Sequence, residues 1–209
     1  MASLIGPSGL EREAVRPQSD IAIKFLGSLL FAGLMAMCAV SFRLWFTPVP
    51  ITFQVLGVIL SGLVLGSRWG AISQLEYLAT GAMGLPVFAN WTGGPAAFVG
   101  PSGGYLIGFV VGAFAAGWVF ERLGGRTGLA AWAGGIAGIA GVYLPGALWL
   151  GVWLGIAGGK PVEACIRGAW QLGIVPFVAV DLLKAAVAAG LVLGGRAANG
   201  KRGNGVVGS

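Results

Sequence analysis

The stretch VPFVAVDLLKAAVAAG, residues 175–190, carries one acid and one base within an otherwise apolar run. Asp181 and Lys184 are three residues apart, which places both side chains on one face of an α-helix. An ionisable side chain inside a membrane helix costs about 3 kcal/mol on insertion scales, so each one needs a reason. The residues alone leave two interpretations open: an ion pair facing the interior of a helical bundle, or the polar end of a ligand pocket.

The composition indicates that lipid surrounds such a helix. Of the 209 residues, 56% are hydrophobic and only 10% are charged, which is far from the balance of a soluble globular domain. The 39 glycines fit the same interpretation, because small residues let membrane helices approach closely. The sequence therefore predicts an all-α integral membrane protein and excludes a disordered chain.

Six hydrophobic runs predict a bundle of six transmembrane helices. The second and third runs are shorter than the roughly 20 residues that a helix needs to cross the hydrocarbon core. The fifth contains Pro145, where we expect a kink or a break. The runs extend from Ile21 to Phe42, Ile51 to Gly66, Gly70 to Leu85, Gly103 to Phe120, Leu129 to Ile156 and Leu172 to Leu193.

Positive residues predict the orientation of this bundle, because Lys and Arg are enriched in cytoplasmic segments. With the N-terminus inside, residues 1–20 are a cytoplasmic segment, 21–196 form the six-helix domain, and 197–209 are a polar cytoplasmic tail that we expect to be disordered. We therefore expect a multi-pass protein of the plasma (inner) membrane with both termini in the cytoplasm. The cytoplasmic positive residues are then Arg12, Arg16, Lys24, Arg68, Arg122, Arg126, Arg196, Lys201 and Arg202, and the external ones are Arg43, Lys160 and Arg167.

Several function classes find no support in the sequence. The net charge is +6, but the basic residues are scattered singly, so no nucleic-acid partner is expected. The chain has no His, and Cys38 and Cys165 do not have metal-ligand spacing, so no metal site is expected. GPSGGY at 100–105 lacks the lysine and the preceding strand of a phosphate loop, so any ATP must be hydrolysed by another subunit.

The connection from Pro86 to Ser102 is uncharged, rich in glycine and contains aromatic residues, which is typical of a lid over a ligand site. The alternative is an interfacial loop with Trp91 in the aromatic belt of the membrane. Glu76 lies in another apolar run, and we expect it to snorkel toward the membrane surface or to face a neighbouring helix rather than a ligand. Neutral hydrogen-bonding groups that suit an amide-like ligand lie in and near the connection, namely Gln54, Asn90, Ser102 and Tyr105.

Three segments together resemble one known family. They are TPVPITFQVLGVILSGLVLGSRWGAISQLEYLATGAMGLPVFANWTGG at 47–94, GPSGGYLIGF at 100–109 and PFVAVDLLKAAVAAG at 176–190. Their order and separation resemble those of the BioY family, the biotin-binding S components of energy-coupling factor vitamin transporters. The resemblance implies a six-helix S-component bundle that binds biotin near the external face, under loops that close over it. It implies a transport protein without a cofactor and not an enzyme.

The resemblance also implies roles for particular residues. The DxxK motif of the family maps onto Asp181 and Lys184, which would serve the N–H groups and the carbonyl of the biotin ureido ring. Aromatic walls for the apolar part of biotin would come from Trp91, Phe88, Phe53 and Tyr105, with Gln54 nearby. No arginine in the lid or its borders matches the one that can hold the biotin carboxylate in the family. The substitutes are Asn90, the backbone N–H groups of Gly93 and Gly94, and Ser102.

The partners implied by the resemblance are a transmembrane coupling protein and two cytoplasmic ATPase subunits, although some members of the family are reported to work without a dedicated partner. Ala32 and Ala36 match the AxxxA pattern that docks against the coupling protein, while ordinary helix packing would give the same spacing. Three other functions stay open: a related transporter for another vitamin, a membrane-embedded enzyme using Glu76 or Asp181 as acid or base, and a structural subunit of a larger complex.

Overall fold

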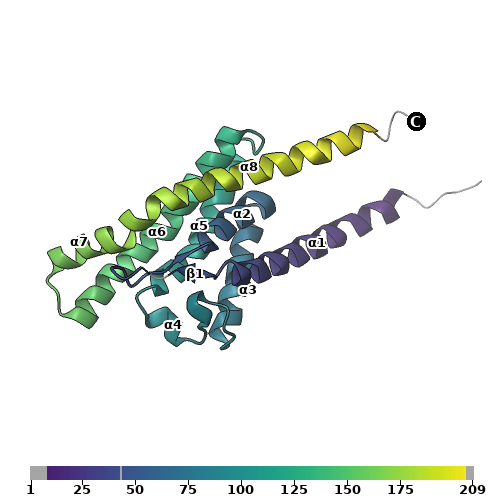
Figure 1. Cartoon of the computed structure of the whole chain (residues 1–209). Coiled ribbons are helices and arrows are strands. Elements are labelled where there is room, and N and C mark those ends of the chain that lie inside the picture. Colours follow the sequence, from purple (N-terminus) through teal and green to yellow (C-terminus); the bar gives the residue numbers. More distant parts are fainter. Residues whose placement is uncertain (1–8, 43, 206–209) are drawn as a thin grey trace, which may run out of the picture.

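The computed structural model describes residues 9–42 and 44–205 and is almost entirely helical (Figure 1). The predicted features at residues 1–8, Arg43 and 206–209 lie outside this range. The elements are α1 (Gly9–Met37), β1 (Ser41–Phe42), β2 (Ile51–Thr52), α2 (Gln54–Leu65), α3 (Ser67–Ala82), the 3₁₀ turn η1 (Ala89–Trp91), α4 (Ala96–Val99), α5 (Gly103–Arg122), α6 (Gly128–Gly158), α7 (Val162–Gly173) and α8 (Val175–Gly205).

The prediction of an all-α membrane protein is confirmed. Four segments of the described chain are long and apolar enough to cross a membrane: the part of α1 from Asp20, then α5, α6, and the region Val162–Ala197 that contains α7 and most of α8. Helices α2 and α3 have 12 and 16 residues. At a rise of ~1.5 Å per residue they are shorter than the ~30 Å hydrocarbon core, as the two short runs predict.

The largest difference from the six predicted runs is α7. The sixth run starts at Leu172, but this residue belongs to a separate amphipathic helix that ends at Gly173. The backbone leaves helical geometry at Ile174, with φ −121° and ψ −58°. Pro176 supplies a physical reason, because proline fits the first turn of a helix and restricts the residue before it. Helix α8 therefore begins at Val175, and the bundle has a short helix in addition to α1, α2, α3, α5, α6 and α8.

Three further boundaries also differ from the sequence prediction. Helix α6 continues without a break through Pro145, where a kink or break was expected. Neighbouring helices can satisfy or shield the backbone groups that proline frees in a membrane protein. The first run does not stay helical to Phe42, because Ser41 and Phe42 pair with Thr52 and Ile51 in an antiparallel hairpin. Helix α8 extends to Gly205, beyond the end of the sixth hydrophobic run at Leu193.

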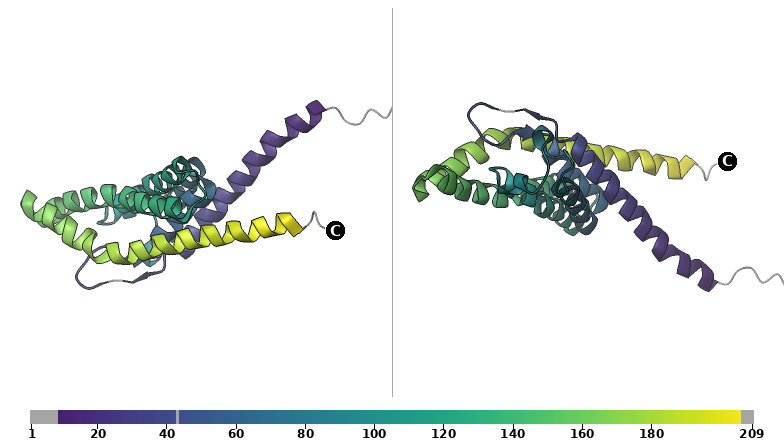
Figure 2. Two further views of the ribbon diagram at one scale, coloured as in Figure 1. Left: turned by 90° about the horizontal axis from the view of Figure 1, so that it is seen from above. Right: turned by 90° about the horizontal axis from the view of Figure 1, so that it is seen from below.

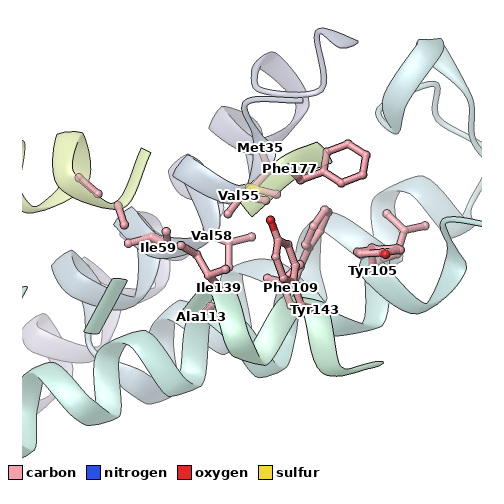
Figure 3. Packing of buried hydrophobic residues seen from close by; sticks show 14 of the residues in the cluster. Met35, Val55, Val58, Ile59, Tyr105, Phe109, Ala113, Ile139, Tyr143 and Phe177 are labelled. Carbon is pink, nitrogen blue, oxygen red and sulfur yellow. The ribbon is translucent and has the colours of Figure 1, made fainter. Parts of the chain in front are cut away.

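Glycines allow the central helices to pack backbone to backbone. A Cβ atom at Gly108 of α5 would lie 2.5 Å from the carbonyl oxygen of Val142 in α6. A Cβ atom at Gly62 of α2 would lie 2.3 Å from the carbonyl oxygen of Ala113 in α5. Figure 3 shows apolar side chains from several helices meeting in this region, among them Val58, Ile139 and Phe109.

One end of the bundle gathers two turns and the last part of α8. Glu121 at the end of α5 accepts hydrogen bonds from the backbone N–H and the hydroxyl of Ser67, at the start of α3, both at 2.9 Å. Arg196 of α8 contacts the carbonyl oxygen of Gly125 in the α5–α6 turn. The turn between α6 and α7 lies at the opposite end (Figure 1), and α1 diverges from the bundle toward its N-terminus (Figure 2).

Candidate functional site

A cavity of about 790 Å³ lies between the β1–β2 hairpin, the Pro86–Ser102 connection and helices α2, α5, α6 and α8. Its volume falls within the range of small-molecule sites, which is roughly 300–1,000 Å³. Eight of the residues predicted for a ligand site line this cavity: Gln54, Phe88, Asn90, Gly93, Ser102, Tyr105, Asp181 and Lys184. Segments that are far apart in the sequence therefore meet at one place.

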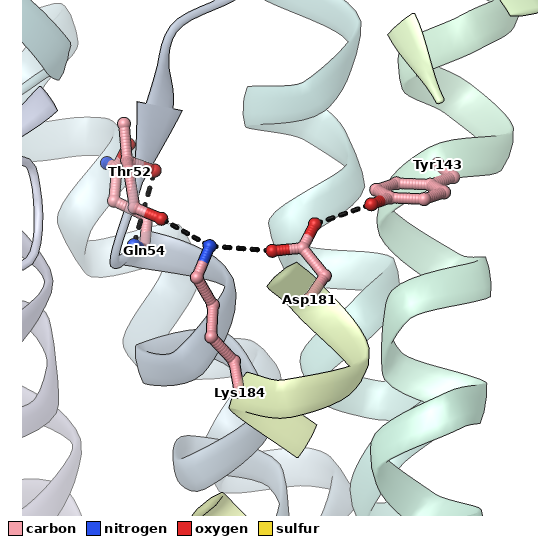
Figure 4. Close-up of polar contacts among 5 residues, drawn as sticks. All are labelled: Thr52, Gln54, Tyr143, Asp181 and Lys184. Atoms are coloured by element: carbon pink, nitrogen blue, oxygen red, sulfur yellow. Dashed lines mark hydrogen bonds and ion pairs between the residues drawn. The ribbon is translucent and has the colours of Figure 1, made fainter. Parts of the chain in front are cut away.

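The acid and the base of α8 form an ion pair within the cavity (Figure 4). The Lys184 Nζ lies 2.6 Å from the Asp181 Oδ1, and both residues are buried, at 7% and 2% exposure. Lys184 also donates a hydrogen bond of 2.6 Å to the carbonyl oxygen of Thr52 in β2. Because a buried charge is costly without partners, these bonds hold the pair in a defined geometry.

Tyr143 of α6 completes this group, and sequence reasoning missed it. Its hydroxyl donates a hydrogen bond of 2.5 Å to the Asp181 Oδ2, so each carboxylate oxygen has one donor (Figure 4). An ionised carboxylate accepts up to four hydrogen bonds and an ammonium donates three. Within the described part of the chain, two donors of Lys184 are occupied, so the pair retains one donor and further acceptor capacity for a polar ligand.

Gln54 at the start of α2 belongs to a second buried network. Its side-chain N–H donates a hydrogen bond of 2.5 Å to the Tyr77 hydroxyl, which donates one of 2.9 Å to the carbonyl oxygen of Val87. Gln54 is 2% exposed. The network connects α2 and α3 to the beginning of the Pro86–Ser102 connection, so it fixes one wall of the cavity next to the ion pair.

The connection adopts left-handed backbone at two successive residues, Asn90 with φ 60° and Trp91 with φ 57°. Asparagine tolerates this conformation, but a bulky residue seldom does. Ser41 binds the turn from the hairpin side, donating to the Asn90 Oδ1 at 3.2 Å and accepting from the Asn90 N–H at 3.1 Å. Such local strain is common at ligand-binding segments.

Three of the residues predicted for the site, Trp91, Gly94 and Phe53, do not line the cavity. Trp91 is the last residue of the left-handed turn and is 77% exposed. Gly94 donates its N–H to the carbonyl oxygen of Gly81 at 2.7 Å. Its neighbour Gly93 does line the cavity, as does Ser102. The Tyr105 hydroxyl, which was considered for a ligand, donates to the carbonyl oxygen of Gly173 at 2.8 Å.

Aromatic side chains form the apolar walls. Phe88 is 2% exposed and packs edge to face against both Tyr77 and Phe98, with ring centroids 5.5 and 5.6 Å apart. Phe109 of α5 and Phe177 of α8 also line the cavity and were not singled out from the sequence. Phe53, which was considered as a wall, is 49% exposed and does not line it. The cavity thus has a charged end beside an apolar interior.

Glu76, Ala32 and Ala36 lie away from this cavity. Glu76 faces α1, as expected, and its Oε1 accepts a hydrogen bond of 2.9 Å from the Ser28 hydroxyl. Ala32 and Ala36 are partly buried and pack against the core of the chain itself. Among the described residues, no group of three or more His, Cys, Asp or Glu side chains gathers at one place to hold a metal ion.

Comparisons with known proteins support one family. The BioY family model matches residues 14–201. The biotin transporter BioY of Thermotoga maritima is 43% identical over 148 residues, covering 70% of this chain and 80% of that protein. The biotin transporter BioY of Rhizobium etli is 37% identical over 177 residues, covering 81% and 89%.

A solved structure has the same fold. It is a crystal structure of the S-component for biotin from an ECF-type ABC transporter, with a TM-score of 0.71 and 25% sequence identity. The match covers 85% of this chain and 93% of that one. Since the family match extends over most of the sequence and the fold agrees, the chain belongs to the BioY family.

Proposed function

We propose that the chain is the biotin-binding, substrate-capture subunit of a vitamin uptake transporter. The observation that carries the proposal is the Asp181–Lys184 ion pair at one end of a cavity of about 790 Å³. The relatives named biotin transporter BioY support the choice of biotin over another vitamin. They are transporters, so no chemistry on the ligand is proposed. Glu76, which was considered as the acid or base of a membrane-embedded enzyme, lies outside the cavity.

The charged end of the cavity fits the ureido ring of biotin. That ring offers two N–H donors and one carbonyl acceptor, which correspond to the acceptor capacity of Asp181 and the remaining donor of Lys184. Hydrogen bonds to ionised groups are shorter and stronger than neutral ones. The ion pair therefore supplies both polarity and orientation to the ring.

The rest of the cavity fits the apolar part of the vitamin and its carboxylate. The thiophane ring and valeryl chain would lie against Phe88, Tyr105 and Phe109, which line the interior. Asn90 and Ser102 line it too and can donate to the carboxylate. Trp91 would reach the ligand only if the Pro86–Ser102 connection closes over the cavity, which is the lid function that we propose for it.

Replacement of Asp181 by Asn tests the site. The change removes a charge-assisted acceptor and leaves Lys184 without its counter-ion, so biotin affinity should fall by more than about tenfold, or ~1.5 kcal/mol. The measurement is equilibrium binding of radiolabelled biotin to detergent-purified protein. Glu163→Gln, which neutralises an exposed carboxylate on α7, is the matched control and should bind as the wild type does.

Near-wild-type affinity of Asp181→Asn would remove Asp181 from the site. Competition by unlabelled riboflavin or thiamine that equals competition by biotin would contradict the choice of ligand. Absence of any binding by folded wild-type protein would favour a structural subunit instead.

We further propose that uptake uses a transmembrane coupling protein and two cytoplasmic ATPase subunits, with the exposed part of Ala32 and Ala36, which are only partly buried against the core, at the contact. Replacing both alanines by Leu should leave biotin binding by the purified protein intact while lowering biotin uptake by cells that contain the partners. Gly190→Leu is the control, because Gly190 is exposed on α8 with open space around it. Unchanged uptake by the double variant would mean that the two alanines serve only helix packing.

A further inference from the structure

A second cavity, of about 910 Å³, lies along the outer side of α6, where α7 packs beside it. Small residues of α6 form its floor, including Ala147, Gly151 and Gly155. Its rims are exposed apolar side chains, such as Leu148 of α6 and Ile166 of α7. We call this feature the α6–α7 groove.

The surroundings of the α6–α7 groove favour an acyl chain as its occupant. Helices α6 and α7–α8 are apolar enough to span a membrane, so the exposed rims face hydrocarbon rather than water. Helix packing in lipid depends on van der Waals contact, and a groove lined with Gly and Ala leaves a hollow that no side chain of the described residues fills. A lipid tail has the shape and polarity to restore those contacts.

One basic residue at the end of the groove favours a lipid with an anionic headgroup. Lys160, in the turn between α6 and α7, is the one charged residue of its lining, and it is exposed. Among the residues that the structure describes, no carboxylate lies within ion-pair distance of Lys160. Its ammonium is therefore available to a phosphate group at the membrane surface.

The groove is long enough to hold an acyl chain. Its lining on α6 extends from Ala137 to Gly155, about 27 Å at the helical rise of ~1.5 Å per residue, and the part from Gly155 to Tyr143 is about 18 Å. Half of the ~30 Å hydrocarbon core is ~15 Å, so a chain that enters at the Lys160 end reaches Tyr143 near the middle of the membrane. Tyr143 lines both the groove and the cavity that contains Asp181.

We propose that the α6–α7 groove binds an anionic diacyl phospholipid, with its phosphate at Lys160 and one acyl chain extending to the back of Tyr143. The site shares Tyr143 with the proposed biotin cavity, but it does not depend on the identity of the transported ligand. The acyl chain bound in the groove packs against the part of α6 that carries Tyr143.

Headgroup selectivity is tested by native mass spectrometry of the purified full chain, incubated with phosphatidylglycerol or with phosphatidylcholine of the same acyl chains. The wild type should retain phosphatidylglycerol about fivefold better, the effect expected of one lysine near a membrane surface. Lys160→Gln should abolish the preference. Arg167→Gln is the matched control, because Arg167 is an exposed cation of α7 outside the groove lining, and it should keep the preference. Equal retention of the two lipids by the wild type would overturn the proposal. An equal loss of the phosphatidylglycerol preference in Lys160→Gln and Arg167→Gln would overturn it too.

Acyl-chain binding is tested by filling the floor. A Cβ atom at Gly151 would lie no closer than 3.7 Å to its neighbours, so Gly151→Leu can extend into the groove. This variant should lose retention of both lipids, whereas Gly190→Leu, on an open face of α8, should not. Wild-type retention by folded Gly151→Leu would overturn the assignment of the chain to this groove. If Gly151→Leu does not fold, the headgroup comparison of Lys160→Gln with Arg167→Gln decides alone.

Discussion

Asp181 is held at both oxygens before any ligand is present. Lys184 donates to its Oδ1 at 2.6 Å and Tyr143 to its Oδ2 at 2.5 Å. Two donors from different helices fix the plane of the carboxylate, and a fixed acceptor loses less conformational entropy when a ligand binds. Tyr143 is therefore a positioning residue that acts on the ligand through Asp181.

The Tyr143→Phe variant should lower biotin affinity by about three- to tenfold, since one hydrogen bond to a charged group is lost while the aromatic wall is kept. Isothermal titration of purified protein measures the effect. In the double variant with Asp181→Asn, the two losses should not add, because both act on the same contact. Additive losses would mean that Tyr143 contributes to binding independently of Asp181.

At the residue scale, the sequence predicts which ionisable residues belong to the site better than it predicts the neutral residues that bind them. Asp181 and Lys184 are conspicuous because charge is rare in an apolar run. Tyr143 is 38 residues from Asp181, and no spacing connects the two. Trp91 and Gly94 were selected by their place in a Gly-rich connection, but its left-handed turn leaves Trp91 exposed and outside the cavity lining.

At the scale of the elements, contact between α5 and α6 depends on glycine. A Cβ atom at Gly108 would meet the carbonyl oxygen of Val142 at 2.5 Å, which is closer than real Cβ contacts allow. Because the obstacle is backbone, it cannot move away as a flexible side chain can. The two helices would have to separate along the wall that carries Tyr143.

Gly108→Ala should therefore lower the free energy of unfolding by about 1–3 kcal/mol, the usual cost of overpacking. A thermal unfolding scan in detergent measures the shift of the apparent Tm. Gly190→Ala is the control, because it brings the same gain in helix propensity at a site with no atom within 4 Å. An unchanged Tm for Gly108→Ala would show that α5 and α6 can separate without cost.

Hydrophobic runs predict the helices well and their ends poorly. The two short runs correspond to α2 and α3, because their length follows directly from the sequence. The break at Ile174 is marked in the sequence only by Pro176, since the apolar pattern continues across it from Leu172. At Pro145 the helix does not break, because a proline inside a packed membrane helix does not have to interrupt it.

At the scale of the whole molecule, the distribution of charge separates the two ends of the bundle. Arg68, Arg122, Arg126 and Arg196 lie at or next to the end where Glu121 binds Ser67 and Arg196 contacts Gly125. Lys160 belongs to the α6–α7 turn at the other end (Figure 1). We therefore propose, from the positive-inside rule, that the arginine-rich end lies in the cytoplasm and the Pro86–Ser102 connection on the external side.

This orientation is testable by cysteine labelling with a membrane-impermeant maleimide, in a background where Cys38 and Cys165 are replaced by Ala. Glu163→Cys on α7 should react in intact cells, whereas Arg126→Cys in the α5–α6 turn should react only after the cells are permeabilised. Both side chains are exposed in the structure, so accessibility reports the side of the membrane and not burial. The cysteine-free protein is the control for background labelling. The reverse pattern would open the Asp181 cavity toward the cytoplasm, and capture of biotin from outside would then require the bundle to invert before it binds.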